Sequence, residues 1–249
     1  PQSPQIFKQF LMVGGIDKYY QIVKCFRDED LRSDRQPEFT QIDCEMSFVN
    51  QDDIFDQFEG LISNLFSKFL SKNDISFEKM TYKFAIENYG TDKPDLRYDL
   101  IINEISFEVK GKGFQVFDNN DFTSCIKVEG KSEITRKEID NITDWVKRPQ
   151  IGANGLLWIK HNNDSSIKSS FDKFFSQADL KSILDKISSK PGDVIFIMSG
   201  NRKNTLEQMG SLRIGLANKF DLIDNNKICP LWVTDFPLFE WDEDEKRFF

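Results

Sequence analysis

The sequence has little of what metal centres and disulfide frameworks need. Its 249 residues include one histidine, His161, and four cysteines that never fall in a C-x-x-C pair. Structural zinc sites draw on closely spaced cysteines and histidines, and small disulfide-stabilised domains carry many paired cysteines. We therefore expect four reduced thiols, no metal site, and a structural role for the histidine.

Long apolar runs are also missing. No stretch approaches the roughly 20 apolar residues of a membrane-spanning helix, and the first residues, PQSPQIFKQF, lack the pattern of a signal peptide. These absences favour a soluble cytoplasmic protein without a membrane partner. The net charge of −8 argues against general attraction to nucleic acid, although a local basic patch can still steer an RNA.

The apolar content of 39% is enough for ordinary protein cores in a chain of this length. The chain begins with Pro1 rather than Met and stops at Phe249, directly after a strand-like segment. We therefore expect an excised piece, a mature product or a cloned segment of a longer protein.

The first hundred residues predict a β-hairpin with one helix before it and two helices after it. Ser3 and Pro4 predict the N-cap and first position of a short helix that a Gly-Gly pair ends. The segments YYQIVKCFR and EFTQIDCEMSFV predict a β-hairpin with a long polar loop. Asn50 is expected to cap a long amphipathic helix, and residues 81–90 a short helix with a cap at each end.

The pattern changes near Ile101 to short strands that alternate with helices, and it changes back after Ser199. Thr135 and Glu138 predict the capping box of one of these helices. The segments predicted as strands are EISFEVKG, GFQVF, SCIKVEG, GLLWIKH and DVIFIMSG.

A helical pattern resumes from Asn201 to Lys219, and the strand-like segment CPLWVTDFPLFEW follows it. We therefore predict an α+β fold in which residues 1–100 and 200–249 form one core and residues 101–199 form a smaller inserted α+β domain.

The second hairpin strand has one face that suits a ligand better than a core. Because side chains alternate across a strand, one face is apolar and can pack on the helix after Asn50. The other face presents an aromatic ring, an amide and two carboxylates, which need water, a cation or a polar ligand. The residues of this polar face are Phe39, Gln41, Asp43, Glu45 and Ser47.

The first strand and the loop add donors for a nucleotide. An arginine such as Arg27 can bind two phosphate oxygens at once. The ring of Phe39 can stack on a base, and Glu29 can accept a hydrogen bond from an exocyclic amine. The loop also supplies Arg32, Arg35 and Gln36. A solvated hairpin with weak surface ion pairs fits the same spacing, so both interpretations stay open on spacing alone.

The string FRDEDLRSDRQPEFTQID resembles motif 2 of the class II aminoacyl-tRNA synthetases, in the form found in the bacterial aspartyl branch. The segments PQSPQIFKQ, YGTDKPDLR and LWVTDFPLFEW are similar to segments of the same family in the same order. The resemblance covers nearly the whole chain, more loosely between Ile101 and Ser199. It implies part of a class II antiparallel-sheet core with an inserted domain similar to one in an amidotransferase subunit.

The resemblance also implies a reaction. Aspartate and ATP form aspartyl-adenylate, and the aspartyl group passes to the 3′ end of tRNA. Mg²⁺ accompanies the ATP phosphates, with ligands mostly outside this chain, and the full-length parent is a homodimer. The oligonucleotide-binding barrel, motif 1 and motif 3 of the family are not found in the sequence, so the fragment itself is expected to be inactive.

The resemblance implies a role for each residue of the hairpin. Arg27 binds the α-phosphate and the activated carboxylate and is the catalytic residue. The remaining ATP contacts are Glu29 to the adenine amine, Phe39 to the ring, and Gln36. Aspartate is bound by Lys8, Gln5 and Asp43, with Glu45 as a weaker, more distant candidate. Arg32 and Arg35 lie in the loop that approaches the tRNA acceptor end.

Two other functions stay open at this point. A catalytically silent, synthetase-like RNA-binding or regulatory protein would also keep the hairpin. An amidotransferase subunit would contain the inserted domain, but the hairpin argues against it.

Overall fold

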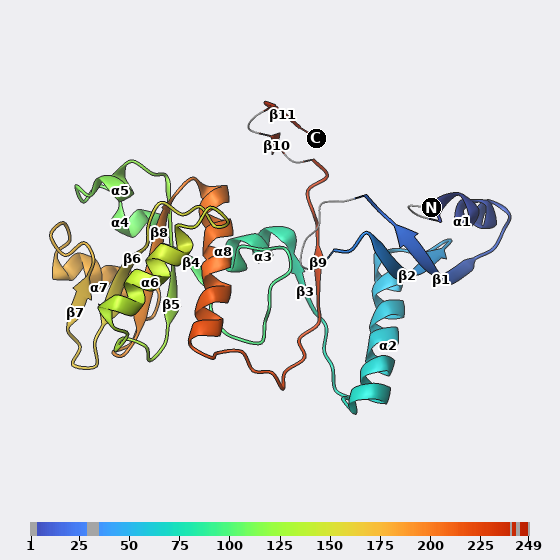
Figure 1. Cartoon of the computed structure of the whole chain (residues 1–249), viewed down its shortest axis with the longest axis horizontal. Helices are drawn as coiled ribbons and strands as arrows, with labels where there is room; N and C mark the ends of the chain where they lie inside the picture. The colour runs from blue at the N-terminus through green and yellow to red at the C-terminus, as the bar shows by residue number, and fades with distance from the viewer. Residues whose placement is uncertain (1–3, 29–34, 240, 243–244, 249) are drawn as a thin grey trace. The chain divides into compact units, whose positions relative to one another are not determined.

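The computed structural model divides into two compact units, Pro1–Asp74 and Ile75–Phe249, and both contain helices and strands. The chain is therefore α+β, as predicted (Figure 1). The boundary between the units falls inside the predicted first core segment, and the assignment of residues 101–199 to an inserted domain stays a prediction. The residues that the structure describes are 4–28, 35–239, 241–242 and 245–248.

The first unit is an antiparallel hairpin with a helix before it and a helix after it. The hairpin register runs from the pair Lys18 and Met46 to the pair Phe26 and Glu38, which confirms the predicted hairpin. The predicted cap Ser3 lies outside the described residues. The elements are α1 (Gln5–Val13), β1 (Lys18–Phe26), β2 (Glu38–Met46) and α2 (Gln51–Leu70).

The helix α2 begins at the predicted cap. Asn50 accepts hydrogen bonds from the backbone of Asp52 and Asp53, and the Asp53 side chain accepts one from the Asn50 backbone. This reciprocal capping satisfies donors that a helix start otherwise leaves free. As expected, the apolar side of β2 lies toward α2. Ile42, Cys44 and Met46 line a hollow of about 570 Å³ together with Phe58 and Leu61.

The second unit is built around a five-stranded sheet in the order β4-β5-β8-β6-β7, with every neighbouring pair antiparallel. A parallel pair, β3 and β9, and a short pair, β10 and β11, lie outside this sheet. The strands are β3 (Glu78–Thr81), β4 (Ile102–Glu104), β5 (Phe122–Val128), β6 (Leu157–His161), β7 (Ile167–Ser169), β8 (Val194–Gly200), β9 (Leu231–Thr234), β10 (Trp241–Asp242) and β11 (Arg247–Phe248). The helices are α3 (Tyr82–Tyr89), α4 (Ser106–Val109), α5 (Gln115–Asp118), α6 (Arg136–Val146), α7 (Gln177–Lys186) and α8 (Arg202–Lys219).

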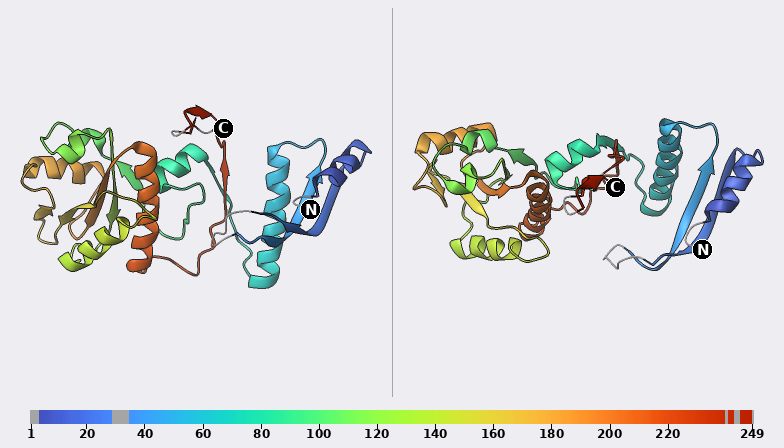
Figure 2. Two further views of the ribbon diagram at one scale, coloured as in Figure 1. Left: turned by 45° about the horizontal axis from the view of Figure 1, so that its top comes forward. Right: turned by 90° about the horizontal axis from the view of Figure 1, so that it is seen from above.

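Helices cover both faces of this sheet, so it has two apolar cores (Figure 2). One core lies under α6 and α8, where Ile142 and Leu212 pack with Phe196 of β8. The other core lies under α4, α5 and α7, where Leu180 packs with Ile195. The strand β8 sends alternate side chains into the two cores, as a central strand buried on both faces must.

A buried arginine joins α8 to the segment that leads into β4. Arg213 is 1% exposed, and its guanidinium donates to the carbonyl oxygens of Leu100, Asp95 and Tyr98 at 2.5, 2.7 and 3.2 Å. It also lies over the Tyr98 ring, 4.1 Å from the centre. The core around the sheet therefore includes residues before Ile101 and after Ser199.

Two predicted strands are wrong. The segment EISFEVKG contains the end of β4 and then the helix α4, and GFQVF contains the start of α5. Ile105 and Val109 are buried while Phe107 between them is 93% exposed, which is helical spacing rather than alternation. Phe114 and Phe117 pack edge to face at 5.1 Å, again a helical spacing. Short apolar runs fit either pattern until burial is known.

Other predictions in this unit are confirmed, with one boundary corrected. The helix α3 has Thr81 as its N-cap and Gly90 in the left-handed conformation at its end. The predicted strand CPLWVTDFPLFEW is too long: β9 ends at Thr234, Asp235 has a φ of 57°, and Pro237 follows. A left-handed residue and a proline both interrupt strand pairing.

The predicted capping box of α6 is present and makes a pH-dependent contribution to stability. Glu138 accepts hydrogen bonds from the Thr135 backbone at 2.9 Å and hydroxyl at 2.8 Å, and from Lys219 at 3.2 Å. These donors, the Thr135 backbone first, lower the pKa of Glu138 from 4.5 to about 2. Because the folded-state pKa is depressed, the stabilisation is present above pH 4.5 and lost as the pH falls toward 2.

Glu138→Gln is therefore expected to flatten the fall in unfolding free energy over the interval from pH 4.5 down to 2. Denaturant titrations at several pH values measure this slope. Glu207→Gln removes an exposed carboxylate of α8 outside any capping box and serves as the control. An unchanged slope in Glu138→Gln would contradict the assignment.

Candidate aspartate and nucleotide site

An ion-pair cluster joins α1 to β2 in the first unit. The Lys8 ammonium lies 2.9 Å from Asp43 Oδ1 and 3.1 Å from Glu45 Oε2. Lys8 and Asp43 are 9% and 6% exposed, whereas the Glu45 side chain is 36% exposed. The period of two on β2 places both carboxylates on one face. The structure thus brings together Lys8 and Asp43, which the resemblance assigns to aspartate, and Glu45 is a direct ion-pair partner of Lys8; the assignment of these residues to aspartate stays a prediction.

The cluster has charge and hydrogen-bonding capacity left for a ligand. One ammonium faces two carboxylates, so the cluster is negative overall. Asp43 Oδ2 is buried and has no hydrogen-bond partner among the residues that the structure describes. The hydrogen bond to Asp43 raises the pKa of Lys8, with a smaller contribution from Glu45, so the amine stays charged. A cationic donor from a ligand would satisfy the free oxygen.

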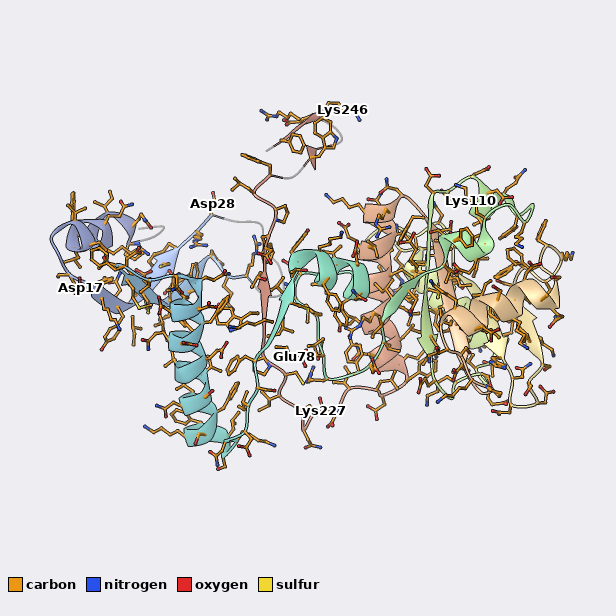
Figure 3. All side chains as sticks on the ribbon, turned by 180° about the vertical axis from the view of Figure 1, so that it is seen from behind. Asp17, Asp28, Glu78, Lys110, Lys227 and Lys246 are labelled. Carbon is orange, nitrogen blue, oxygen red and sulfur yellow. The ribbon has the colours of Figure 1, made fainter. Side chains whose placement is uncertain are left out.

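A second group lies toward the loop end of the same hairpin face. The Arg27 guanidinium lies over the Phe39 ring, 5.1 Å from its centre. The backbone N–H of Arg27 donates to the Pro37 carbonyl at 2.9 Å, which continues the pairing of the strands beyond β1. In Figure 3, Asp17 and Asp28 mark the two ends of β1. The Phe39 ring and the backbone hydrogen bond together hold the Arg27 guanidinium at the point where the strands enter the loop.

The other residues predicted to bind ATP, aspartate or tRNA belong to neither of these two groups, and some lie outside the described residues. Gln36 borders a hollow of about 540 Å³ that Phe39 also lines. Gln5 is exposed at the start of α1, and its side chain makes no hydrogen bond with another described residue. Arg35 is exposed at the base of the loop. Glu29 and Arg32 lie outside the described residues.

Sequence reasoning gave no role to one pair on this face. The fully buried Cys25 thiol donates to Gln41 Oε1 at 3.4 Å. Cys25 is opposite Phe39 in the hairpin register, and Gln41 is two residues further along β2. Alternation along β1 puts Arg27 and Cys25 on one face, but only the hairpin register shows that Gln41 of β2 lies on the same face.

The residues that the structure describes contain no group of three or more His, Cys, Asp or Glu side chains that can hold a metal ion. None of their helices is both long enough and apolar enough to cross a membrane.

The whole chain, residues 1–249, matches the family of tRNA synthetases class II (D, K and N). It is similar to the aspartate–tRNA ligases of Azobacteroides pseudotrichonymphae (49% identical), Flavobacterium psychrophilum (50%) and Parabacteroides distasonis (51%). Each match covers 100% of this chain and 43%, 42% and 43% of the relative, respectively, so the chain spans less than half of their length. Among solved structures, an aspartyl tRNA synthetase from Entamoeba histolytica matches with a TM-score of 0.30 and 18% identity, covering 92% of this chain and 52% of that one.

The cluster geometry predicts unequal costs for neutralising its two carboxylates. Asp43→Asn leaves the buried Lys8 without its closest charged partner and should lower the unfolding free energy by roughly 1–2 kcal/mol. Glu45→Gln changes a more exposed partner and should cost less than about 1 kcal/mol. Denaturant unfolding near neutral pH measures both. Equal costs, or a larger cost for Glu45→Gln, would contradict the predicted order.

Proposed function

Because this chain belongs to the class II tRNA synthetases (D, K and N) and is a partial-length homologue of aspartate–tRNA ligases, we propose that it forms part of an aspartate-activating site. In the proposed reaction aspartate and ATP give aspartyl-adenylate and pyrophosphate, and tRNA then receives the aspartyl group. The observation that carries the proposal is the negative cluster around Lys8 on the same hairpin face as the Arg27 and Phe39 pair.

The cluster complements free aspartate in charge. The Lys8 ammonium can bind the side-chain carboxylate of aspartate, and the unpartnered Asp43 oxygen can accept from its α-ammonium. Gln5, one turn before Lys8 on α1, is the proposed second contact to that ammonium. Since Lys8 and Asp43 are already held by each other, little side-chain entropy is lost on binding.

The other end of the face suits the nucleotide. The Arg27 fork can bind two oxygens of the α-phosphate, and Phe39 offers an aromatic surface for adenine. We assign Gln36 and Glu29 to further ATP contacts. The α-carboxylate oxygen of aspartate attacks the α-phosphorus, and pyrophosphate leaves with the electrons of the broken P–O bond. Arg27 stabilises the charge that builds on the phosphoryl oxygens in the transition state.

Further components belong to the proposal for the full-length protein. Mg²⁺ accompanies ATP, but the described residues hold no cluster of ligands for it. Arg32 and Arg35 are assigned to the loop that meets the tRNA acceptor end. A homodimer in the cytoplasm is expected for the parent.

Arg27→Ala in the full-length enzyme is expected to slow aspartate-dependent pyrophosphate exchange by about a hundredfold to a thousandfold. Loss of one charge-stabilising donor typically costs roughly 3–4 kcal/mol at the transition state. The thermal unfolding temperature should change little, because Arg27 is only half-buried at a strand end. Lys18→Ala removes an exposed cation at the other end of β1 and is the matched control.

Phe39→Ala tests the proposed stacking on adenine in the same assay, apart from the phosphate-binding role of Arg27. Loss of stacking should raise the KM for ATP by about tenfold, with a smaller change in the KM for aspartate. If Arg27→Ala keeps near-normal exchange while the protein stays folded, the activation role is wrong. A silent RNA-binding protein would then be the better interpretation.

The 249-residue chain alone is expected to form no aspartyl-adenylate at a measurable rate. It spans 43% of the length of its relatives, so we infer that other parts of the site come from residues beyond it. Pyrophosphate exchange by the isolated chain, compared with exchange by the full-length enzyme, measures this. Aspartate-dependent exchange well above the buffer control would show that these residues suffice.

A further inference from the structure

We infer that Ser47 is a positioning residue for aspartate binding, because its hydroxyl ties the last turn of α1 to the hairpin. This inference rests on the proposed function. Ser47 is the last polar residue of the face that begins at Phe39, and the proposed contacts to aspartate and ATP leave it without a role.

Ser47 is held in the hairpin and also reaches α1. Its backbone N–H donates to the Asp17 carbonyl at 2.9 Å, which continues the strand pairing one residue beyond Met46. Its hydroxyl donates to the Met12 sulfur of α1 at 3.2 Å. Because the backbone hydrogen bond fixes Ser47 in the hairpin, the hydroxyl attaches the helix to that frame.

The spacing of the contacts on α1 matches their spacing on β2. Lys8 contacts Asp43 and Glu45. One turn later, Met12 contacts Ser47. A helix rises about 6 Å over the four residues from Lys8 to Met12. A strand rises about 7 Å over two residues, the interval from Glu45 to Ser47. The helix therefore has two polar contacts to the hairpin, one turn apart.

Two contacts fix the direction of a helix, whereas one contact leaves it free to tilt. Most apolar side chains of α1 are exposed, so packing does little to replace the second contact. Gln5 lies before Lys8 in α1, and Met12 lies after it. A shift of about 1 Å at Met12, with the Lys8 contact as pivot, moves Gln5 by about 0.75 Å, the ratio of the two helical rises. The Ser47 contact therefore keeps Gln5 and Lys8 in place together for aspartate.

The residues proposed to bind the nucleotide belong to the hairpin itself. A tilt of α1 leaves the pair of Arg27 and Phe39 unchanged. Loss of the Ser47 contact should therefore weaken aspartate binding and spare ATP binding. A change that only loosened the fold of the first unit would affect both substrates.

Pyrophosphate exchange by the full-length enzyme tests this role. Ser47→Ala should raise the KM for aspartate by about three- to tenfold, the usual worth of one hydrogen bond. It should change the KM for ATP and kcat by less than about twofold, because the nucleotide residues stay in place. Ser47→Thr keeps the hydroxyl and should restore a near-normal KM for aspartate. Ser67→Ala removes a hydroxyl of α2 that donates to Asn73 at 2.6 Å, and as the control it should leave the KM for aspartate unchanged.

Met12→Leu keeps the test decisive if Ser47→Ala folds poorly, as monitored by thermal unfolding. It preserves the volume of the side chain, removes the acceptor, and should raise the KM for aspartate as Ser47→Ala does. Since both residues act through one contact, the double variant should be no worse than either single variant. Multiplied effects, equal rises in the KM for aspartate and for ATP, or an unchanged KM for aspartate would overturn the role of Ser47. A rise in Ser67→Ala equal to that in Ser47→Ala would also overturn it.

Arg27→Ala, measured beside them, separates this inference from the proposed function. If Arg27→Ala slows exchange while Ser47→Ala leaves the KM for aspartate unchanged, only the role of Ser47 is wrong. If Arg27→Ala exchanges normally, the proposed function itself fails.

Discussion

In the first unit, the position of α1 on the hairpin depends on the ion pair between Lys8 and Asp43. Little apolar area attaches α1 to the hairpin, because Phe7, Phe10 and Val13 are 76%, 69% and 88% exposed. The buried 2.9 Å contact between helix and strand therefore does much of the work of positioning α1. Breaking a buried pair costs more than the pair contributes, since the remaining charge loses its partner. The groups that position the helix are thus the same groups that we assign to the amino acid.

The proposed role in binding aspartate would account for the two carboxylates that face Lys8. A single carboxylate would neutralise Lys8 and leave nothing for a substrate ammonium. With Glu45 as the second partner, Lys8 can share its hydrogen bonds with an incoming carboxylate while Asp43 keeps an oxygen free. The more exposed Glu45 is the partner that can give way at lower cost, because water can replace its hydrogen bond. The buried Asp43 can then stay in place.

The sequence predicted those features that local patterns determine. The alternation in EFTQIDCEMSFV gave the hairpin and its polar face, and the residues at helix starts gave the caps at Asn50, Thr81 and Thr135. It failed for α4 and α5, where a few apolar residues fit two periodicities and only tertiary burial decides. The contact of Cys25 with Gln41 was also missed, because it depends on the hairpin register, which no single strand contains.

The five-stranded sheet of the second unit ends on both sides in a strand of three residues, β4 and β7. Edge strands carry unpaired backbone groups that can recruit strands from other molecules. At β4, the Asn103 side chain also donates to the carbonyl oxygen of Ile101 and so occupies one of these acceptors. A sheet with such short edge strands offers little template for pairing with strands of other molecules.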